Sequence, residues 1–202
     1  MSPPTGRSRL VITVPGTGSS DLSMAPLRHY LARIGHRPQG WGLGRNDSRR
    51  FEVLEEQLAT KVTDLQNEYH DTVDLIGWSL GGTLVRATAR AIPNSIGRII
   101  TYGTPVIGGP RYTVAARSFP ESEIRDIERR VAERRQSRPM AVPVTAIYSR
   151  NDGVVAWEAC IDPDNADVEH IEVTSSHLGM NLDPDVWAII VQRLDQPTTA
   201  ND

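Results

Sequence analysis

The chain alternates short runs of apolar residues with longer segments whose apolar residues recur at helical spacing. The short runs, typical of buried strands, cover residues 10–14, 71–78, 96–102, 142–148 and 168–173, and a further short strand is expected around 36–41. Helical spacing predicts helices over residues 24–34, 51–69, 80–92 and 184–194. Strands that alternate with helices are typical of an α/β protein whose sheet is mainly parallel.

One segment, residues 104–140, interrupts this alternation. It begins with a stretch rich in glycine and proline and continues into a charged helix over residues 121–135. Three residues form the narrow apolar stripe of that helix: Ile124, Ile127 and Val131. Such a stripe suits docking on a surface rather than forming a core. Its place in the chain favours a small helical cap inserted into a single domain over residues 9–195, and the alternative is a solvated helix.

A serine framed by glycines lies between the strand that ends at residue 78 and the helix that follows. The sequence Gly77-Trp78-Ser79-Leu80-Gly81 is the pattern of a nucleophile elbow, in which the serine adopts a strained backbone conformation. Side chains at positions 77 and 81 would collide with the neighbouring strand and helix, so glycine permits the close approach. The turn is expected to lift the Ser79 hydroxyl to the carboxyl edge of the sheet, at a helix N-terminus that favours negative charge.

A serine hydroxyl needs a base to take its proton, and histidine is the usual one. The chain has five histidines: His29, His36, His70, His170 and His177. Only His177 comes directly after a predicted strand in a loop of small residues, where parallel sheets place reacting groups. Asp152 follows the 142–148 strand in the same way and is the candidate acid that orients the imidazole. Three rivals for the acid lie further into a polar loop: Asp162, Asp164 and Asp167.

Acyl transfer also needs hydrogen-bond donors for the oxyanion that develops on the substrate. The N–H group of Leu80, the residue after the nucleophile, is expected to supply one donor. The loop Pro15-Gly16-Thr17-Gly18 follows the first strand, and its glycines let backbone amides point at the oxyanion. The N–H group of Thr17 is therefore the expected second donor.

These motifs together resemble those of the α/β-hydrolases of the small esterase/lipase type. The matching segments are residues 15–20, 77–81, 149–155 and 176–180. The chain order Ser79, Asp152, His177 is that of nucleophile, acid and base in this family. Pro15 stands where the family often has histidine, which leaves the backbone donor in place.

The resemblance implies a minimal α/β-hydrolase fold, with a mainly parallel six-stranded sheet, helices on both faces and the small helical cap. It also implies a serine hydrolase that cleaves carboxylic esters through an acyl-enzyme intermediate. Apolar residues close to the expected site predict the wall of a pocket for an acyl group. The candidates are Trp78, Val106, Ile107, Phe119, Val154, Trp157, Leu178 and Met180. The expected substrate is a small-molecule ester or thioester with an apolar acyl group.

Other activities use the same residues. A thioesterase or an acyltransferase would use the same triad, and the arginines of the cap suit an anionic carrier such as coenzyme A. A non-catalytic ligand-binding protein on the hydrolase scaffold would also keep the three residues. A nucleotide-binding protein is disfavoured, because Asp21 stands where a dinucleotide-binding loop has its third glycine.

Composition excludes several classes of function. The 202 residues suffice for one sizeable core, and 39% hydrophobic and 23% charged residues are ordinary for a globular protein. A net charge of −3 gives no electrostatic case for nucleic acid. No apolar run approaches the roughly 20 residues of a membrane span, and the first residues lack the apolar core of a signal peptide, so a cytoplasmic protein is expected.

Metal and cofactor chemistry are not expected, because the histidines are scattered and no His-Glu-x-x-His motif is present. Cys160 is the one cysteine in the chain, which excludes an internal disulfide. Its neighbours indicate a small buried residue rather than a nucleophile.

Overall fold

A computed structural model of the chain describes residues 8–165 and 167–197. The sequence predicts a loose leader over residues 1–8 and a polar tail over residues 196–202, and these segments fall largely outside the described residues. Among the helices that the structure describes, none is both long enough and apolar enough to cross a membrane.

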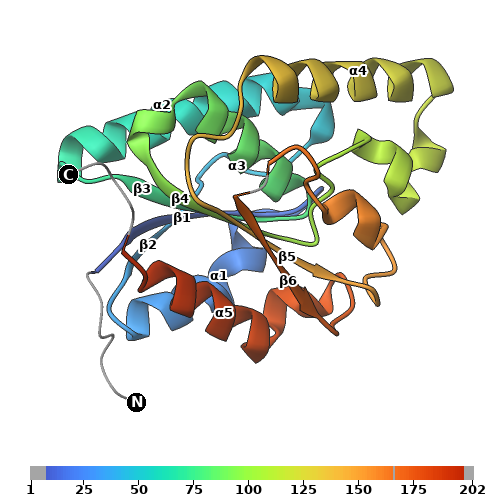
Figure 1. The fold of residues 1–202 in the computed structure, drawn as a ribbon. Coiled ribbons are helices and arrows are strands. Elements are labelled where there is room, and N and C mark those ends of the chain that lie inside the picture. The colour runs from blue at the N-terminus through green and yellow to red at the C-terminus, as the bar shows by residue number, and fades with distance from the viewer. Residues whose placement is uncertain (1–7, 166, 198–202) are drawn as a thin grey trace.

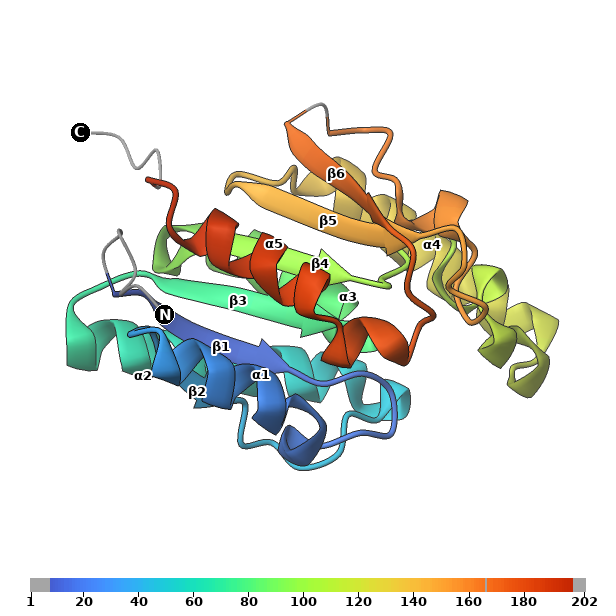
Figure 2. The same ribbon diagram turned by 90° about the horizontal axis from the view of Figure 1, so that it is seen from below.

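Six strands form one sheet in the order β2-β1-β3-β4-β5-β6. Their bounds are Leu10–Val14 for β1, Arg37–Gly40 for β2, Val73–Trp78 for β3, Ile96–Tyr102 for β4, Val144–Ser149 for β5 and Val168–Val173 for β6. Every neighbouring pair is parallel, so all six strands end at the same edge (Figure 2). This confirms the predicted α/β architecture. The strand order reverses between β1 and β3, and parallel sheets place their ligand sites at such a reversal.

Helices cover both faces of the sheet (Figure 1). Helices α1 (Asp21–Arg33) and α5 (Pro184–Leu194) lie on one face, and α2 (Phe51–Tyr69), α3 (Leu80–Ala91) and α4 (Glu121–Ser137) lie on the other. The sheet therefore separates two apolar clusters. One packs strand residues such as Leu75 against α2 and α3, and the other packs residues such as Ile76 against α1 and α5. Alternate residues of β3 enter opposite clusters because strand side chains alternate between faces.

The structure places several element ends away from the predicted positions. Helix α1 begins at Asp21 rather than at residue 24, because its first turn is solvent-facing, with Leu22 exposed, and Met24 is the first buried position. Strand β5 begins at Val144 rather than at residue 142, because Pro143 has no N–H group to donate to the ladder. Helix α4 continues to Ser137, two residues beyond the expected end.

The 104–140 segment has two parts with different surroundings. Its first part contains the short 3-10 turns η3 (Gly109–Tyr112) and η4 (Val114–Ser118). This part pairs with the loop that follows Asp152, because Val114 N–H donates to the Val154 carbonyl at 2.9 Å. Its second part, α4, lies along α2, where Arg130 and Arg134 make ion pairs with glutamates of that helix. A cap over the site remains a prediction, and the first part is the one beside the acid loop.

Candidate active site

Ser79 occupies the turn between β3 and α3 with φ 54° and ψ −124°. A positive φ at a residue other than glycine costs on the order of 1–3 kcal/mol, and it persists only where the surroundings impose it. Here the Ser79 N–H group donates to the Tyr102 carbonyl at 3.0 Å, and the Thr104 hydroxyl donates to the Ser79 carbonyl at 3.1 Å. The end of β4 therefore holds the strained residue in place.

The glycines of the elbow are required by close contacts between backbones. A Cβ atom at Gly77 would lie 2.6 Å from the carbonyl oxygen of Gly81. A Cβ atom at Gly81 would overlap the carbonyl oxygen of Val14, at the end of β1. The elbow thus fits between β1 and the start of α3, as its sequence pattern predicts.

His177 and Asp152 meet although they follow different strands. The imidazole Nδ1 lies 2.8 Å from Asp152 Oδ2, and both side chains are buried. A carboxylate accepts, so Nδ1 carries the proton and Nε2 keeps its lone pair free. The His177 N–H group also donates to the Asp152 carbonyl at 2.9 Å, which joins the two loops through their backbones.

The other oxygen of Asp152 is fixed by the turn that follows it. Asp152 Oδ1 accepts hydrogen bonds from the N–H groups of Val154 at 2.9 Å and Val155 at 2.6 Å. The Asp-Gly dipeptide allows this turn, since Gly153 has φ 77°. The carboxylate therefore has one oxygen for the turn and one for the imidazole.

The imidazole lies against the same structural elements that hold Ser79. The rings of Trp78 and His177 are 5.6 Å apart, and Trp78 Nε1 donates to the His177 carbonyl at 3.3 Å. A Cβ atom at Gly103 would lie 3.0 Å from His177 Nδ1. Trp78 directly precedes Ser79, and Gly103 directly follows Tyr102, whose carbonyl holds Ser79. The serine and the imidazole therefore lie close together at the carboxyl ends of β3 and β4. In the described part of the chain no hydrogen bond joins the Ser79 hydroxyl to the imidazole.

The loop after β1 lies against the elbow. A Cβ atom at Gly16 would be 3.2 Å from Ser79 Cβ, so the loop passes beside the candidate nucleophile. Within the described ranges the N–H groups of Thr17 and Leu80 donate to no protein acceptor. For Leu80 this follows from its position at the first residue of α3, where N–H groups lack intrahelical partners.

Asn46, which the sequence pattern did not single out, fastens this loop. Its buried side chain donates from Nδ2 to the Pro15 carbonyl at 2.7 Å. Its backbone accepts from Gly18 N–H at 2.7 Å and donates to the Ser19 carbonyl at 2.9 Å. Asn46 comes from the connection between β2 and α2, so a distant segment sets the shape of the loop.

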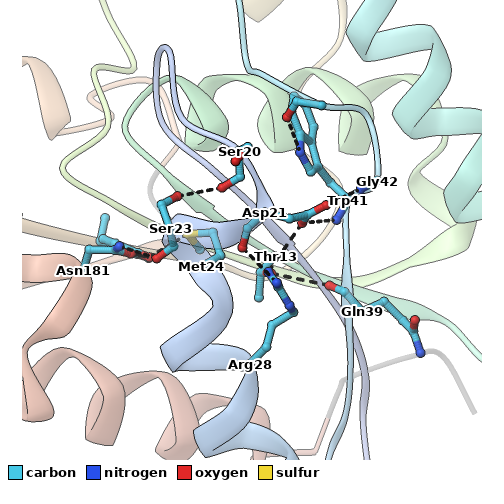
Figure 3. A network of polar contacts seen from close by, with 12 residues as sticks. Thr13, Ser20, Asp21, Ser23, Met24, Arg28, Gln39, Trp41, Gly42 and Asn181 are labelled. Carbon is cyan, nitrogen blue, oxygen red and sulfur yellow. Dashed lines mark hydrogen bonds and ion pairs between the residues drawn. The ribbon is translucent and has the colours of Figure 1, made fainter.

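A second polar network holds the loop that carries His177 (Figure 3). The side chain of Asn181 points at α1, where Nδ2 donates to the Ser23 carbonyl at 2.7 Å. Asn181 Oδ1 accepts from the Tyr102 hydroxyl at 2.8 Å, and burial raises the pKa of that hydroxyl well above its usual range. Asp21, in the same view, accepts from the N–H groups of Trp41 and Gly42 and so joins α1 to the end of β2.

The predicted wall residues occupy different environments. Leu178 is 70% exposed, Met180 is fully buried beside Gly103, and Trp157 lies under the Arg150 guanidinium at 4.0 Å, stacked on Tyr148. The other five are buried or partly buried: Trp78, Val106, Ile107, Phe119 and Val154. Contact of these side chains with a substrate remains a prediction.

Two of the rival acids, Asp162 and Asp164, and the histidine of β6, His170, have partners outside the site. Asp162 pairs with Arg86 and, at 3.3 Å, with Arg135, which also pairs with Asp164. His170 Nε2 accepts from the Asp162 N–H group at 2.9 Å, and burial lowers the pKa of this imidazole. Over the described ranges there is no group of three or more potential metal-ligating side chains. Burial raises the pKa of the Cys160 thiol to about 12.

No protein-family model matches the sequence, and no curated protein matches it. Solved structures match it closely in shape. Alpha/beta hydrolase domain-containing protein 10 from mouse matches with a TM-score of 0.62 at 19% identity, over 95% of this chain and 90% of that one. The chain has the α/β-hydrolase fold.

Two further structures with the α/β-hydrolase fold extend the comparison. The Bacillus licheniformis lipase BlEst2 has a TM-score of 0.70 at 15% identity, over 97% of this chain and 95% of that one. Polyneuridine aldehyde esterase has a TM-score of 0.65 at 12% identity, over 94% of this chain and all (100%) of that one. At these identities the comparison establishes the α/β-hydrolase fold and not the activity.

Proposed function

We propose that the protein is a serine hydrolase that cleaves carboxylic esters through an acyl-enzyme intermediate. The observation that carries the proposal is the 2.8 Å contact between His177 Nδ1 and Asp152 Oδ2, beside the strained Ser79. That contact fixes the tautomer that a general base requires, next to a hydroxyl at the tip of an elbow. The names of the lipase and esterase with the same fold support ester hydrolysis as the reaction.

In the proposed reaction the Ser79 Oγ attacks the ester carbonyl carbon, and its proton passes to His177 Nε2. Asp152 stabilises the imidazolium that forms, and the carbonyl electrons move onto the oxygen. The N–H groups of Leu80 and Thr17 donate to this oxyanion, and each such donor typically contributes about 100-fold or more in rate. When the intermediate collapses, the alcohol leaves with the proton from Nε2 and Ser79 remains acylated. Water, activated by the same imidazole, then releases the acid and restores the serine.

Neither donor has another acceptor in the described ranges, so both are available to an oxyanion. Asn46 keeps the Thr17 loop beside the elbow, so in the proposed mechanism the two donors are in place before substrate binds. Such preorganisation is what makes an oxyanion hole effective. We propose that the turns of residues 109–118, which pair with the loop after Asp152, form the cap side of the pocket and that an apolar acyl group binds between them and the elbow.

Labelling with a fluorophosphonate, followed by mass spectrometry of the modified peptide, tests the proposal directly. The expected result is a single adduct on Ser79, with hydrolysis of p-nitrophenyl esters lost in Ser79→Ala. Ser8→Ala is the matched control, because Ser8 lies just before β1, at the opposite edge of the sheet. An unlabelled Ser79, or ester hydrolysis that survives in Ser79→Ala, would overturn the proposal.

The same assay separates ester hydrolysis from the two other activities that share the triad. Parallel reactions with p-nitrophenyl esters and with acyl-coenzyme A, each with and without an alcohol acceptor, report on the leaving group and on the acceptor. Turnover of the thioester alone would make the protein a thioesterase, and transfer to the alcohol in preference to water would make it an acyltransferase. Binding of esters without turnover would assign a ligand-binding role.

A further inference from the structure

A cavity of about 320 Å³ lies between α2, α3 and α4, away from the candidate active site. Its charged lining consists of Arg90, Arg130, Arg134, Arg138, Glu55 and Glu133. The four guanidinium groups come from α3, from α4 and from the residue after α4, so the helix layer brings together charges that are distant in sequence. In Figure 1 these helices lie together on one face of the sheet.

Only part of this positive charge is neutralised. Arg134 pairs with Glu55 at 2.8 Å, and Arg130 pairs with Glu52 at 3.0 Å. Arg90 donates to the backbone carbonyls of Arg138 at 3.0 Å and Arg86 at 3.4 Å. Across the described residues, neither Arg90 nor Arg138 has an ion pair with a carboxylate. Two guanidinium groups in the cavity therefore have no direct ion pair, and the four arginines of the lining outnumber its two glutamates.

The charge on Arg90 is costly where it lies. Burial, and after it the neighbouring charge of Arg86, lowers the pKa of Arg90 to about 10. Asp162 offsets part of this effect, but Arg90 has no direct ion pair with it, whereas the desolvation of a half-buried cation is normally offset by such a pair. An anion in the cavity would supply a direct counterion.

We propose that this cavity binds a small phosphate-bearing anion. Guanidinium groups match phosphate oxygens with two parallel hydrogen bonds, and they bind phosphate more specifically than a diffuse positive surface does. The cavity volume of about 320 Å³ suits a small ligand. Arg90 lies eleven residues after Ser79 along α3, which corresponds to roughly 16 Å at about 1.5 Å per residue. The anion site is therefore separate from the proposed catalytic site.

Inorganic pyrophosphate is the probe, titrated into the full chain by calorimetry at constant ionic strength. The proposal expects saturable binding that Arg90→Gln and Arg138→Gln each weaken by about tenfold or more, since both remove charge-assisted hydrogen bonds. Arg138 is exposed, so its variant folds even if Arg90→Gln does not. Arg125→Gln is the matched control, because it removes an exposed arginine of α4 that pairs with Glu121 and does not line the cavity.

The outcomes separate the possibilities. Absence of saturable binding, or equal weakening in Arg125→Gln, would overturn the proposal, because the second result would assign binding to general surface charge. Sedimentation with vesicles of phosphatidylcholine and phosphatidic acid gives the second arm, and binding to vesicles without binding of pyrophosphate would also overturn it. Ser79→Ala should bind pyrophosphate as the unchanged protein does, which keeps this test independent of the proposed ester hydrolysis.

Discussion

Substitution of Asp152 by asparagine tests the acid–base pair most sharply, because its two carboxylate oxygens have different partners. Oδ1 accepts from two backbone N–H groups, those of Val154 and Val155, and Oδ2 faces His177 Nδ1. An asparagine must turn its oxygen to one side and its NH₂ group to the other. If the oxygen stays with the backbone donors, the NH₂ group faces Nδ1 and selects the imidazole tautomer that is protonated at Nε2. In that tautomer Nε2 cannot take the proton from Ser79.

The opposite amide orientation would restore the productive tautomer at a calculable cost. It would place the NH₂ group against the N–H groups of Val154 and Val155, which lie 2.9 and 2.6 Å from the present oxygen. Each buried donor without an acceptor costs about 1–3 kcal/mol, so the two cost about 2–6 kcal/mol. At about 1.4 kcal/mol for each factor of ten, kcat should fall by roughly 30-fold to more than 10⁴-fold.

Steady-state hydrolysis of p-nitrophenyl butyrate measures this fall, and thermal unfolding of the same samples checks that Asp152→Asn is folded. Asp164→Asn is the matched control, since it changes an aspartate of the neighbouring polar loop that pairs with Arg135 outside the site. Its kcat should equal that of the unchanged protein. A folded Asp152→Asn variant with unchanged kcat would refute both the assignment of the acid and the tautomer argument.

Four further perturbations have defined outcomes. Asn46→Ala removes the donor to the buried Pro15 carbonyl, so kcat should fall by about tenfold or more with little change in KM, measured with the same ester. Tyr102→Phe leaves Asn181 Oδ1 without its donor and should lower the free energy of unfolding by about 1–3 kcal/mol in urea titrations at pH 7. Because burial raises the pKa of Tyr102, only the unfolded chain loses the phenolic proton above about pH 10. The free energy of unfolding should therefore fall above that pH by about 1.4 kcal/mol per pH unit from this residue. Tyr102→Phe should remove that pH dependence. Cys160, with its pKa raised to about 12 by burial, should react with a disulfide reagent at pH 8 only after unfolding; rapid reaction of the native protein would contradict its placement.

The sequence predicts the bounds of those elements in which the apolar residues alone mark the buried positions. The bounds of β1, β4, β6, α2 and α5 agree with the prediction, because in each the apolar residues alone mark the buried positions. Strand β2, with the sequence Arg-Pro-Gln-Gly, has no apolar pattern, so the sequence places it only approximately, around residues 36–41. The first turn of α1 is missed for a related reason, since Leu22 is exposed there and Asp21 gains its role from Trp41 and Gly42.

The sequence predicts those parts of the candidate site in which the spacing of a motif determines the local backbone structure. The elbow requires glycines at fixed offsets from Ser79, and Asp152 and His177 each follow a strand that ends at one edge. Asn46 and Asn181 could not be found this way, because a single polar residue in a loop has no pattern. Their roles come from backbone carbonyls that are distant in sequence, such as those of Pro15 and Ser23. The same holds for the position of α4 along α2, which depends on ion pairs between two largely solvated faces.

The attachment of the Thr17 loop has a consequence for heating. Asn46, which fastens the loop, belongs to the connection from β2, the four-residue strand at one end of the sheet. Edge strands pair with a neighbour on one side only, and they open at a lower free energy than the interior strands do. Warming should therefore release the Thr17 loop while most helices persist. Ester hydrolysis should then be lost at a lower temperature than the helical circular-dichroism signal.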